Sequence, residues 1–125
     1  MALLIGPAHA LHDSALSIFR RVAEGKLGLI VIPAVVAEVV YVTESIFGWN
    51  RAATTDRVGS LLEADGLMVT ERTTVFRALG FYGQRSRLDF ADAYLAAVAL
   101  EVGPAAVASF DRDFDAVAGI RRVSA

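Results

Sequence analysis

The sequence predicts a layered α/β fold with a parallel sheet, and two observations lead to that prediction. Apolar runs of strand length alternate with segments that have helical periodicity. The run over 27–32 is continuously aliphatic and β-branched, without the alternation typical of a strand that has one face in solvent. Strands that are buried on both faces and separated by helices pair in parallel in layered α/β folds.

The predicted elements follow in order along the chain. Residues 1–6 are apolar and end at a Gly-Pro pair, and an amphipathic helix is expected over 9–25. Pro33 opens a second helix that runs to about residue 47 and is apolar nearly all round. Further helices are predicted over 51–64, 73–82 and 89–102, a helical turn over 113–118, and strands over 67–70, 105–109 and 120–123.

Length and composition limit the classes of function. A chain of 125 residues has room for one domain, and its apolar share of 55% favours a partner surface. No apolar run reaches the roughly 18 residues of a membrane span and no export signal is recognisable, so we expect a cytoplasmic protein. The lack of cysteine excludes disulfides and thiolate sites. With a net charge of −2, nucleic acid would have to bind through local arginine clusters.

Acidic residues beside apolar segments are the main functional signal. In a parallel sheet, ligands bind beyond the carboxyl ends of the strands. Three acids are predicted at that edge: Glu38 after the first buried strand, Asp92 at the start of its helix, and Asp111 after the strand over 105–109. Carboxylate oxygens are the ligands that Mg²⁺ takes, together with water and substrate phosphate. The sequence therefore predicts a divalent-metal site for phosphate chemistry.

Each of these positions also has a structural explanation. Glu38 could be an exposed helical residue, although its valine neighbours leave little surface for exposure. Asp89 is expected to cap its helix, which makes Asp92 the better ligand. Asp113 is placed to cap the turn after it, and Asp89 and Asp113 stay secondary metal candidates. Ser109 could orient a carboxylate or a phosphate, although a serine at a strand end is more often structural.

Basic residues near the acids are candidates for substrate binding. Arg85, Arg87 and Arg112 could hold a phosphate backbone through charged hydrogen bonds, although a solvated loop is the commoner explanation for any one of them. His9 and His12 are three residues apart, but such a pair on an exposed helix is more often solvated than metal-bound.

Three short stretches follow one another in a recognisable order. They are Pro33-Ala-Val-Val-Ala-Glu38-Val-Val-Tyr-Val, Leu88-Asp-Phe-Ala-Asp92-Ala-Tyr-Leu-Ala-Ala and Ser109-Phe-Asp111-Arg-Asp-Phe. Together they resemble PIN-domain ribonucleases, in particular the VapC-type toxins of toxin–antitoxin pairs. The resemblance implies a three-layer α/β/α fold with a mostly parallel central sheet. It also implies RNA cleavage by a water activated by Mg²⁺ or Mn²⁺, a homodimer and a small antitoxin partner, with the family's second, third and fourth acids on Glu38, Asp92 and Asp111.

The chain departs from the family pattern in two places. Ser109 stands where the family usually has threonine. Family members begin with a central strand ending in Asp-Thr-Asn or similar, which gives the first metal acid, whereas no carboxylate precedes Asp13 here. We therefore expect a single PIN-like domain over 1–125 that is truncated at its N-terminus, either because the native protein starts upstream or because this copy is trimmed. As written, the chain is expected to be a weak or inactive nuclease.

The alternative function is a non-catalytic module of the same fold that binds an antitoxin, RNA or a second copy of itself. Its interface would be the side of the second helix formed by Val36, Val40 and Tyr41, if that side is exposed in the monomer.

Overall fold

The structure is a computed structural model that consists of two compact units. It describes residues 17, 20–21, 24–84, 87–103, 106–108, 115 and 117–123. Backbone contacts divide the chain into Met1–Thr70, here called the first unit, and Glu71–Ala125, the second unit. Each unit contains a parallel pair of strands and two long helices, so the predicted α/β class is confirmed.

The first unit pairs β1 (Leu29–Val31) with β2 (Leu67–Val69) in parallel, so that Ile30 lies opposite Met68. These two central side chains are 68% and 65% exposed, whereas the flanking positions of both strands are half-buried. Successive side chains of a strand point to opposite faces, so only one face of the pair is covered. The predicted burial of the first strand on both faces is therefore wrong.

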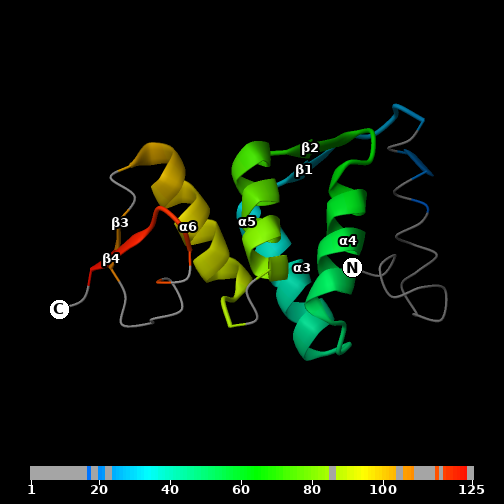
Figure 1. Ribbon diagram of the computed structural model, residues 1–125. Helices are drawn as coiled ribbons and strands as arrows, with labels where there is room; N and C mark the ends of the chain where they lie inside the picture. The colour runs from blue at the N-terminus through cyan, green and yellow to red at the C-terminus, as the bar shows by residue number, and fades with distance from the viewer. Residues whose placement is uncertain are drawn as a thin grey trace. The chain divides into compact units, whose positions relative to one another are not determined.

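Two helices lie on the same side of this strand pair (Figure 1). α3 (Pro33–Ser45) begins at the predicted proline, which occupies a position where its missing N–H is not needed. α4 (Arg51–Leu62) is capped by Asn50, whose side-chain oxygen accepts a hydrogen bond from the backbone nitrogen of Ala53 at 2.8 Å. Both helices end earlier than the sequence pattern predicts.

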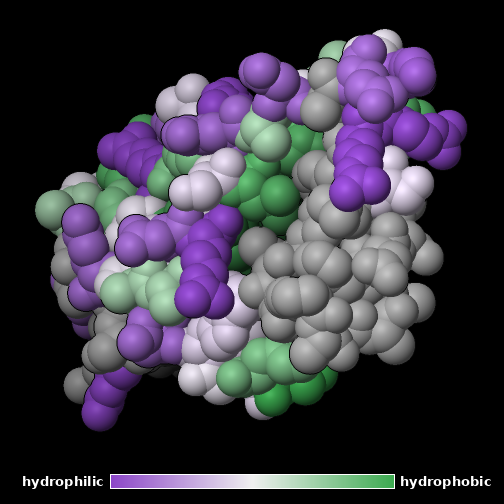
Figure 2. Space-filling model, turned by 90° about the vertical axis from the view of Figure 1, so that its right-hand side faces the viewer, coloured by the Kyte–Doolittle hydropathy of each residue, from purple (hydrophilic) through white to green (hydrophobic). Residues whose placement is uncertain are grey.

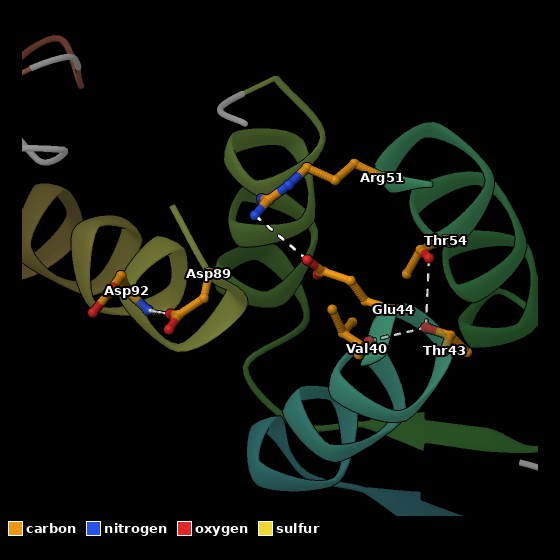
Figure 3. Close-up of polar contacts among 7 residues, drawn as sticks. All are labelled: Val40, Thr43, Glu44, Arg51, Thr54, Asp89 and Asp92. Atoms are coloured by element: carbon orange, nitrogen blue, oxygen red, sulfur yellow. Dashed lines mark hydrogen bonds and ion pairs between the residues drawn. The ribbon is translucent and has the colours of Figure 1, made fainter. Parts of the chain in front are cut away.

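A buried pair of hydroxyl groups connects α3 to α4. Thr43 and Thr54 are both fully buried, and their Oγ1 atoms lie 3.4 Å apart (Figure 3). Thr43 donates to the carbonyl oxygen of Val40 at 3.0 Å, so Thr54 is the donor between the two hydroxyls. Near the same helix ends, Glu44 and Arg51 form a longer ion pair of 3.9 Å. The contact between the helices therefore has a specific polar component.

An apolar pocket of about 120 Å³ lies between the strands and helices of the first unit. Leu29 and Leu67 line it from the strands, Val39 from α3, and Leu61 and Leu62 from α4. Figure 2 shows apolar side chains reaching the surface between hydrophilic ones on the side of the molecule seen there. The described strands and helices of the first unit thus leave an apolar space beneath the strand pair.

The second unit is built on a hairpin of two helices. α5 (Arg72–Gln84) packs along α6 (Phe90–Val102), and the hydrogen bond between Thr74 and Glu101 shows that the start of one meets the end of the other. The fully or nearly fully buried side chains of the two helices include Val75, Ala78, Leu79 and Tyr82 from α5 and Ala93, Ala96 and Ala97 from α6. The small alanine side chains allow the two helix axes to approach closely.

A second parallel strand pair follows the hairpin. β3 (Ala106–Ala108) pairs with β4 (Arg121–Val123), and Val107 lies opposite Arg122. The expected last strand is therefore present, and parallel pairing is confirmed for both sheets. The four described strands form two separate pairs, whereas the sequence predicts one sheet.

The described part of the predicted first helix is its polar side. Arg20 and Arg21 are helical and exposed, and the backbone nitrogen of Lys26 donates to the carbonyl oxygen of Arg21 at 2.9 Å. Gly25 has a φ of +75°, a conformation that glycine adopts readily at a helix end. The predicted stop is confirmed, while residues 1–16, with both histidines, lie outside the described ranges. No helix among the described residues is long and apolar enough to cross a membrane.

Candidate active site

Asp89 and Asp92 form the first turn of α6. Asp89 is the N-cap, with extended backbone, and its Oδ1 accepts a hydrogen bond from the backbone nitrogen of Asp92 at 2.8 Å (Figure 3). The predicted capping role of Asp89 is thereby confirmed. The cap fixes the turn that carries the half-buried side chain of Asp92. It places that carboxylate at the end of the helix where the helix dipole favours negative charge.

Glu38 lies in the middle of α3, and its side chain is exposed. Val36 and Val40 occupy the core side of the helix at 1% exposure each. Residues two positions apart point to nearly opposite sides of a helix, so Glu38 faces away from the core. The expectation that its valine neighbours would leave it little exposed surface is wrong.

The burial of Val36 and Val40 contradicts the interface expected for the alternative function. Because Val36 and Val40 are buried within the first unit, they do not form an exposed side with Tyr41. Tyr41 itself is 65% exposed, since it lies about 100° around the helix from Val40. A partner would meet Tyr41 without these two valines.

The remaining predicted site residues are only partly described. Arg87 lies in the turn before α6 and is exposed. Nearby Asp115, which is not among the predicted site residues, accepts a hydrogen bond from Nε of Arg122 at 3.0 Å and so forms an ion pair with it. The positions outside the described ranges are Arg85, Ser109, Asp111, Arg112 and Asp113.

The donors present suit a hard divalent cation by their chemistry. Glu38 of the first unit and Asp92 of the second both offer carboxylate oxygens, the donor type that Mg²⁺ takes in proteins. No group of three or more His, Asp or Glu side chains able to hold a metal ion occurs within the part of the chain that the structure describes. The grouping of Glu38, Asp92 and Asp111 therefore stays a prediction.

A polar cluster between α5 and α6 was not predicted from the sequence. The hydroxyl of Tyr94 donates to Oε1 of Glu71 at 2.6 Å, and the hydroxyl of Thr74 donates to Glu101. The hydrogen bond to Glu71, burial, and the charges of Glu71 and Glu101 together raise the pKa of Tyr94 to about 12. Tyr94 is therefore a protonated donor at neutral pH. The hydrogen bond of Tyr94 depends on how α5 and α6 pack against each other. No local sequence pattern specifies that packing.

Two arginines of α5 stack on aromatic rings of the same helix, another feature that the sequence analysis missed. The guanidinium of Arg72 lies 4.8 Å from the ring centre of Phe76, and that of Arg77 lies 5.8 Å from the ring centre of Phe81. In each pair the residues are four positions apart, so they are neighbours on the helix surface. That spacing was the signal available in the sequence.

Comparison with known families places these features in context. Residues 7–120 match the PIN domain family, and the matched range includes Glu38, Asp92 and Asp111. No curated protein and no solved structure matches the chain significantly. PIN domains are typically metal-dependent nucleases. Because the match extends over most of its length, this chain belongs to the PIN domain family.

Proposed function

We propose that the chain is a ribonuclease that hydrolyses RNA phosphodiester bonds with Mg²⁺, or with Mn²⁺, as the toxin of a toxin–antitoxin pair. Membership of a family of metal-dependent nucleases supports the reaction class. The observation that carries the proposal is the capped first turn of α6, in which Asp89 fixes the turn that presents Asp92. The toxin role rests on the resemblance of the three stretches described above to VapC-type proteins.

The acidic residues have distinct roles in this proposal. Glu38, Asp92 and Asp111 would hold the metal, Asp89 would orient Asp92 through the shared turn, and Asp113 is a secondary ligand candidate. A divalent cation held there would lower the pKa of a bound water and neutralise charge that builds up on the phosphate during attack. The carboxylates themselves supply the negative charge that selects a cation over other ligands.

Basic side chains would position the RNA. Arg87 is exposed in the turn that leads into α6, two positions before the Asp89 cap. Arg87 is close in the sequence to the turn that carries Asp92. A phosphate bound by Arg87 would therefore lie near that turn. Arg85, Arg112 and Ser109 complete the proposed set of substrate-binding residues.

A homodimer and a small antitoxin are the proposed protein partners. Several large apolar side chains are exposed in this structure, among them Ile30, Met68 and Tyr41, each at 65% or more. Exposed apolar surface of this kind is what a protein partner would cover.

Cleavage of a labelled structured RNA in the presence of Mg²⁺ tests the proposal. The chain is expected to cleave slowly, and Asp92→Asn is expected to abolish cleavage because it removes a charged ligand without changing side-chain size. Asp56→Asn is the matched control, since Asp56 is an exposed acid on α4 outside the proposed site. Equal cleavage by the native chain and Asp92→Asn would refute the assignment.

Metal binding gives a second readout that does not depend on activity. A cation that binds only the folded chain raises its melting temperature, by an amount that grows with the logarithm of the cation concentration divided by its Kd. We expect Mg²⁺ to raise the melting temperature of the native chain and of Asp56→Asn, but not of Asp92→Asn or Glu38→Gln. A shift of the same size in all four proteins would place the metal elsewhere.

A further inference from the structure

The polar side chains of α6 are few, and two of them contact the start of α5. They are Asp92, Tyr94 and Glu101. The hydroxyl of Tyr94 donates to Oε1 of Glu71 at 2.6 Å, and the hydroxyl of Thr74 donates to Glu101. A distance of 2.6 Å is typical of a hydroxyl that donates to an ionised carboxylate, which is one of the stronger kinds of hydrogen bond in proteins. Two of the three polar groups thus connect α6 to one end of α5, and the third is the proposed metal ligand.

The apolar side chains of α6 select its rotation only weakly. Its buried residues are Phe90 at the first position and four alanines, whereas Leu95 is 44% and Val102 is 75% exposed. Beyond Phe90, alanine methyl groups form shallow ridges, which restrict the rotation of a packed helix less than larger side chains do. Directional contacts such as hydrogen bonds therefore contribute more to the choice of one rotation.

Glu71 has an unfavourable backbone conformation that its side chain helps to explain. Its φ is +51°, a positive value that otherwise occurs only at glycines among the described residues. This region is unfavourable for a residue with a Cβ atom, whereas glycine adopts it readily. The backbone nitrogen of Val75 donates to the carbonyl oxygen of Glu71 at 2.9 Å, which holds the residue at the start of α5. A glutamate kept in this conformation points to a role for its carboxylate, the acceptor for Tyr94.

Asp92 and Tyr94 lie on nearly opposite sides of α6. Residues two positions apart are separated by about 200° around the helix axis and about 3 Å along it. The ends of side chains lie about 5 to 6 Å from the axis, so a rotation of about 20° moves them by about 2 Å. Mg²⁺ holds its ligands at about 2.0 to 2.1 Å in nearly octahedral geometry. A rotation that moved Tyr94 away from Glu71 would therefore move the Asp92 carboxylate far enough to lose a ligand.

We propose that Tyr94, through its hydrogen bond to Glu71, is a positioning residue that sets the rotation of α6 and thereby directs Asp92 toward the metal. This inference rests on the proposed ribonuclease function and adds to it a residue outside the acidic set. The cap by Asp89 fixes the first turn of α6 itself, whereas the bond of Tyr94 fixes the helix against α5.

Variants of the two partners separate the hydrogen bond from size and charge. Tyr94→Phe removes only the hydroxyl. Glu71→Gln and Glu71→Met both remove the charge and are similar in length, but only glutamine keeps an oxygen that can accept from Tyr94. Tyr41→Phe is the matched control, because Tyr41 lies on α3 in the first unit and is 65% exposed.

The rotation of α6 can be measured by pulsed electron spin resonance. The chain contains no cysteine, so Thr73→Cys and Ala91→Cys give two nitroxide labels at chosen positions. Both positions are exposed, one near the start of α5 and the other in the first turn of α6. We expect a narrow distribution of distances between the labels when Tyr94 and Glu71 are both present, and also in Glu71→Gln. In Tyr94→Phe and Glu71→Met the distribution should broaden or shift by about 2 Å.

The affinity for Mg²⁺ shows whether this rotation matters to Asp92. The Kd is obtained from the melting temperature of the whole chain, without labels, at a series of Mg²⁺ concentrations. We expect Tyr94→Phe and Glu71→Met to raise the Kd roughly two- to fivefold, because only molecules with the bonded rotation bind the ion. Glu71→Gln and Tyr41→Phe should keep the Kd of the native chain. A merely structural role of Tyr94 would lower the melting temperature without Mg²⁺ and leave the Kd unchanged.

The outcomes separate this inference from the proposed function. An unaltered distance distribution in Tyr94→Phe would overturn the positioning role alone, and so would an altered distribution with an unchanged Kd. Equal effects of Glu71→Gln and Glu71→Met would assign the result to charge and overturn the role of the hydrogen bond. If the native chain bound no Mg²⁺ while Tyr94→Phe altered the distribution, the proposed metal site would be removed and the positioning of a ligand with it.

Discussion

Among the described residues, each unit has a parallel strand pair and two long helices, but the buried side chains of the two units differ. Branched side chains of the first unit leave an apolar pocket of about 120 Å³ beneath the strands. In the second unit Ala78 of α5 and Ala93, Ala96 and Ala97 of α6 are each fully buried. Small buried side chains thus predominate along the helix pair of the second unit, whereas branched side chains surround the pocket of the first.

The two units also differ in whether their polar contacts are buried or exposed. The hydroxyl pair of Thr43 and Thr54 is buried in the first unit, whereas the hydrogen bond from Tyr94 to Glu71 lies at the surface of the second. A buried polar group that loses its partner is costly, while water replaces the partner of an exposed one. The two units should therefore respond unequally to similar substitutions.

The largest expected effect is truncation of a core leucine in each unit. Leu79→Ala should lower the free energy of unfolding by about 4 kcal/mol, because Leu79 is 2% exposed within the alanine-rich hairpin. Leu62→Ala should cost only about 2 to 3 kcal/mol, since Leu62 already borders the pocket and loses fewer contacts. Urea unfolding measures both, and a larger loss for Leu62→Ala would show that the pocket does not weaken packing.

Removal of one hydroxyl from the buried pair comes next. Thr43→Val should cost about 1 to 3 kcal/mol, because it leaves the buried hydroxyl of Thr54 without its acceptor. The double variant Thr43→Val/Thr54→Val removes both hydroxyls and should recover part of that loss. Urea unfolding of all four proteins in the cycle measures the coupling, and strict additivity would mean that the pair makes no specific contribution.

Removal of the exposed hydroxyl of Tyr94 should lower the free energy of unfolding by less than removal of the buried one. The size of this effect should depend on pH. Tyr94→Phe is expected to lower the free energy of unfolding by about 0.5 to 1 kcal/mol at neutral pH, because water replaces the lost contact with Glu71. The folded chain holds the pKa of Tyr94 at about 12, against 10.0 for a free tyrosine. The protonated form is therefore stabilised by folding, so this contribution is complete below pH 10 and is lost as the pH rises from 10 to 12.

Unfolding free energies of the native chain and Tyr94→Phe at neutral pH and across that alkaline range check the sign. The difference between the two proteins should shrink as the pH rises. A difference that stays constant would mean that the hydroxyl does not contribute through its proton.

The smallest effect is expected at Thr55 of α4. Its Oγ1 is buried and has no hydrogen-bond partner among the residues described by the structure. Thr55→Val should leave the free energy of unfolding unchanged or raise it by up to about 0.5 kcal/mol, since a methyl group replaces an unpaired polar atom. Thermal melting of Thr55→Val and of Thr43→Val compares the two substitutions within the first unit. A loss comparable to that of Thr43→Val would reveal a contact that Thr55 makes through its hydroxyl.

Local signals explain what could be predicted from the sequence. The cap at Asp89, the proline start of α3 and the glycine stop after the first helix each depend on a few neighbouring residues, and all three are present in the structure. Within the described ranges, strand and helix types were also correct, because their runs differ clearly in period and length. Their ends were displaced by one to two residues in most cases.

Orientation and long-range contacts could not be predicted in this way. α3 is apolar nearly all round, so its periodicity does not show which side meets the core, and the exposure of Glu38 was misjudged for that reason. The pairing of Tyr94 with Glu71 depends on how α5 and α6 align across the hairpin, which the sequence does not reveal residue by residue. The predicted grouping of three acids is the same kind of inference, because Asp92 and Glu38 come from different units.

The capped turn of α6 joins a folding signal to a proposed chemical group. Asp89 closes the helix through the backbone of the very residue whose side chain would bind the cation. A change at Asp89 would therefore impair metal affinity at the same time as local helix stability. The dependence runs in one direction, because a substitution such as Asp92→Asn keeps the backbone N–H that the Asp89 cap uses.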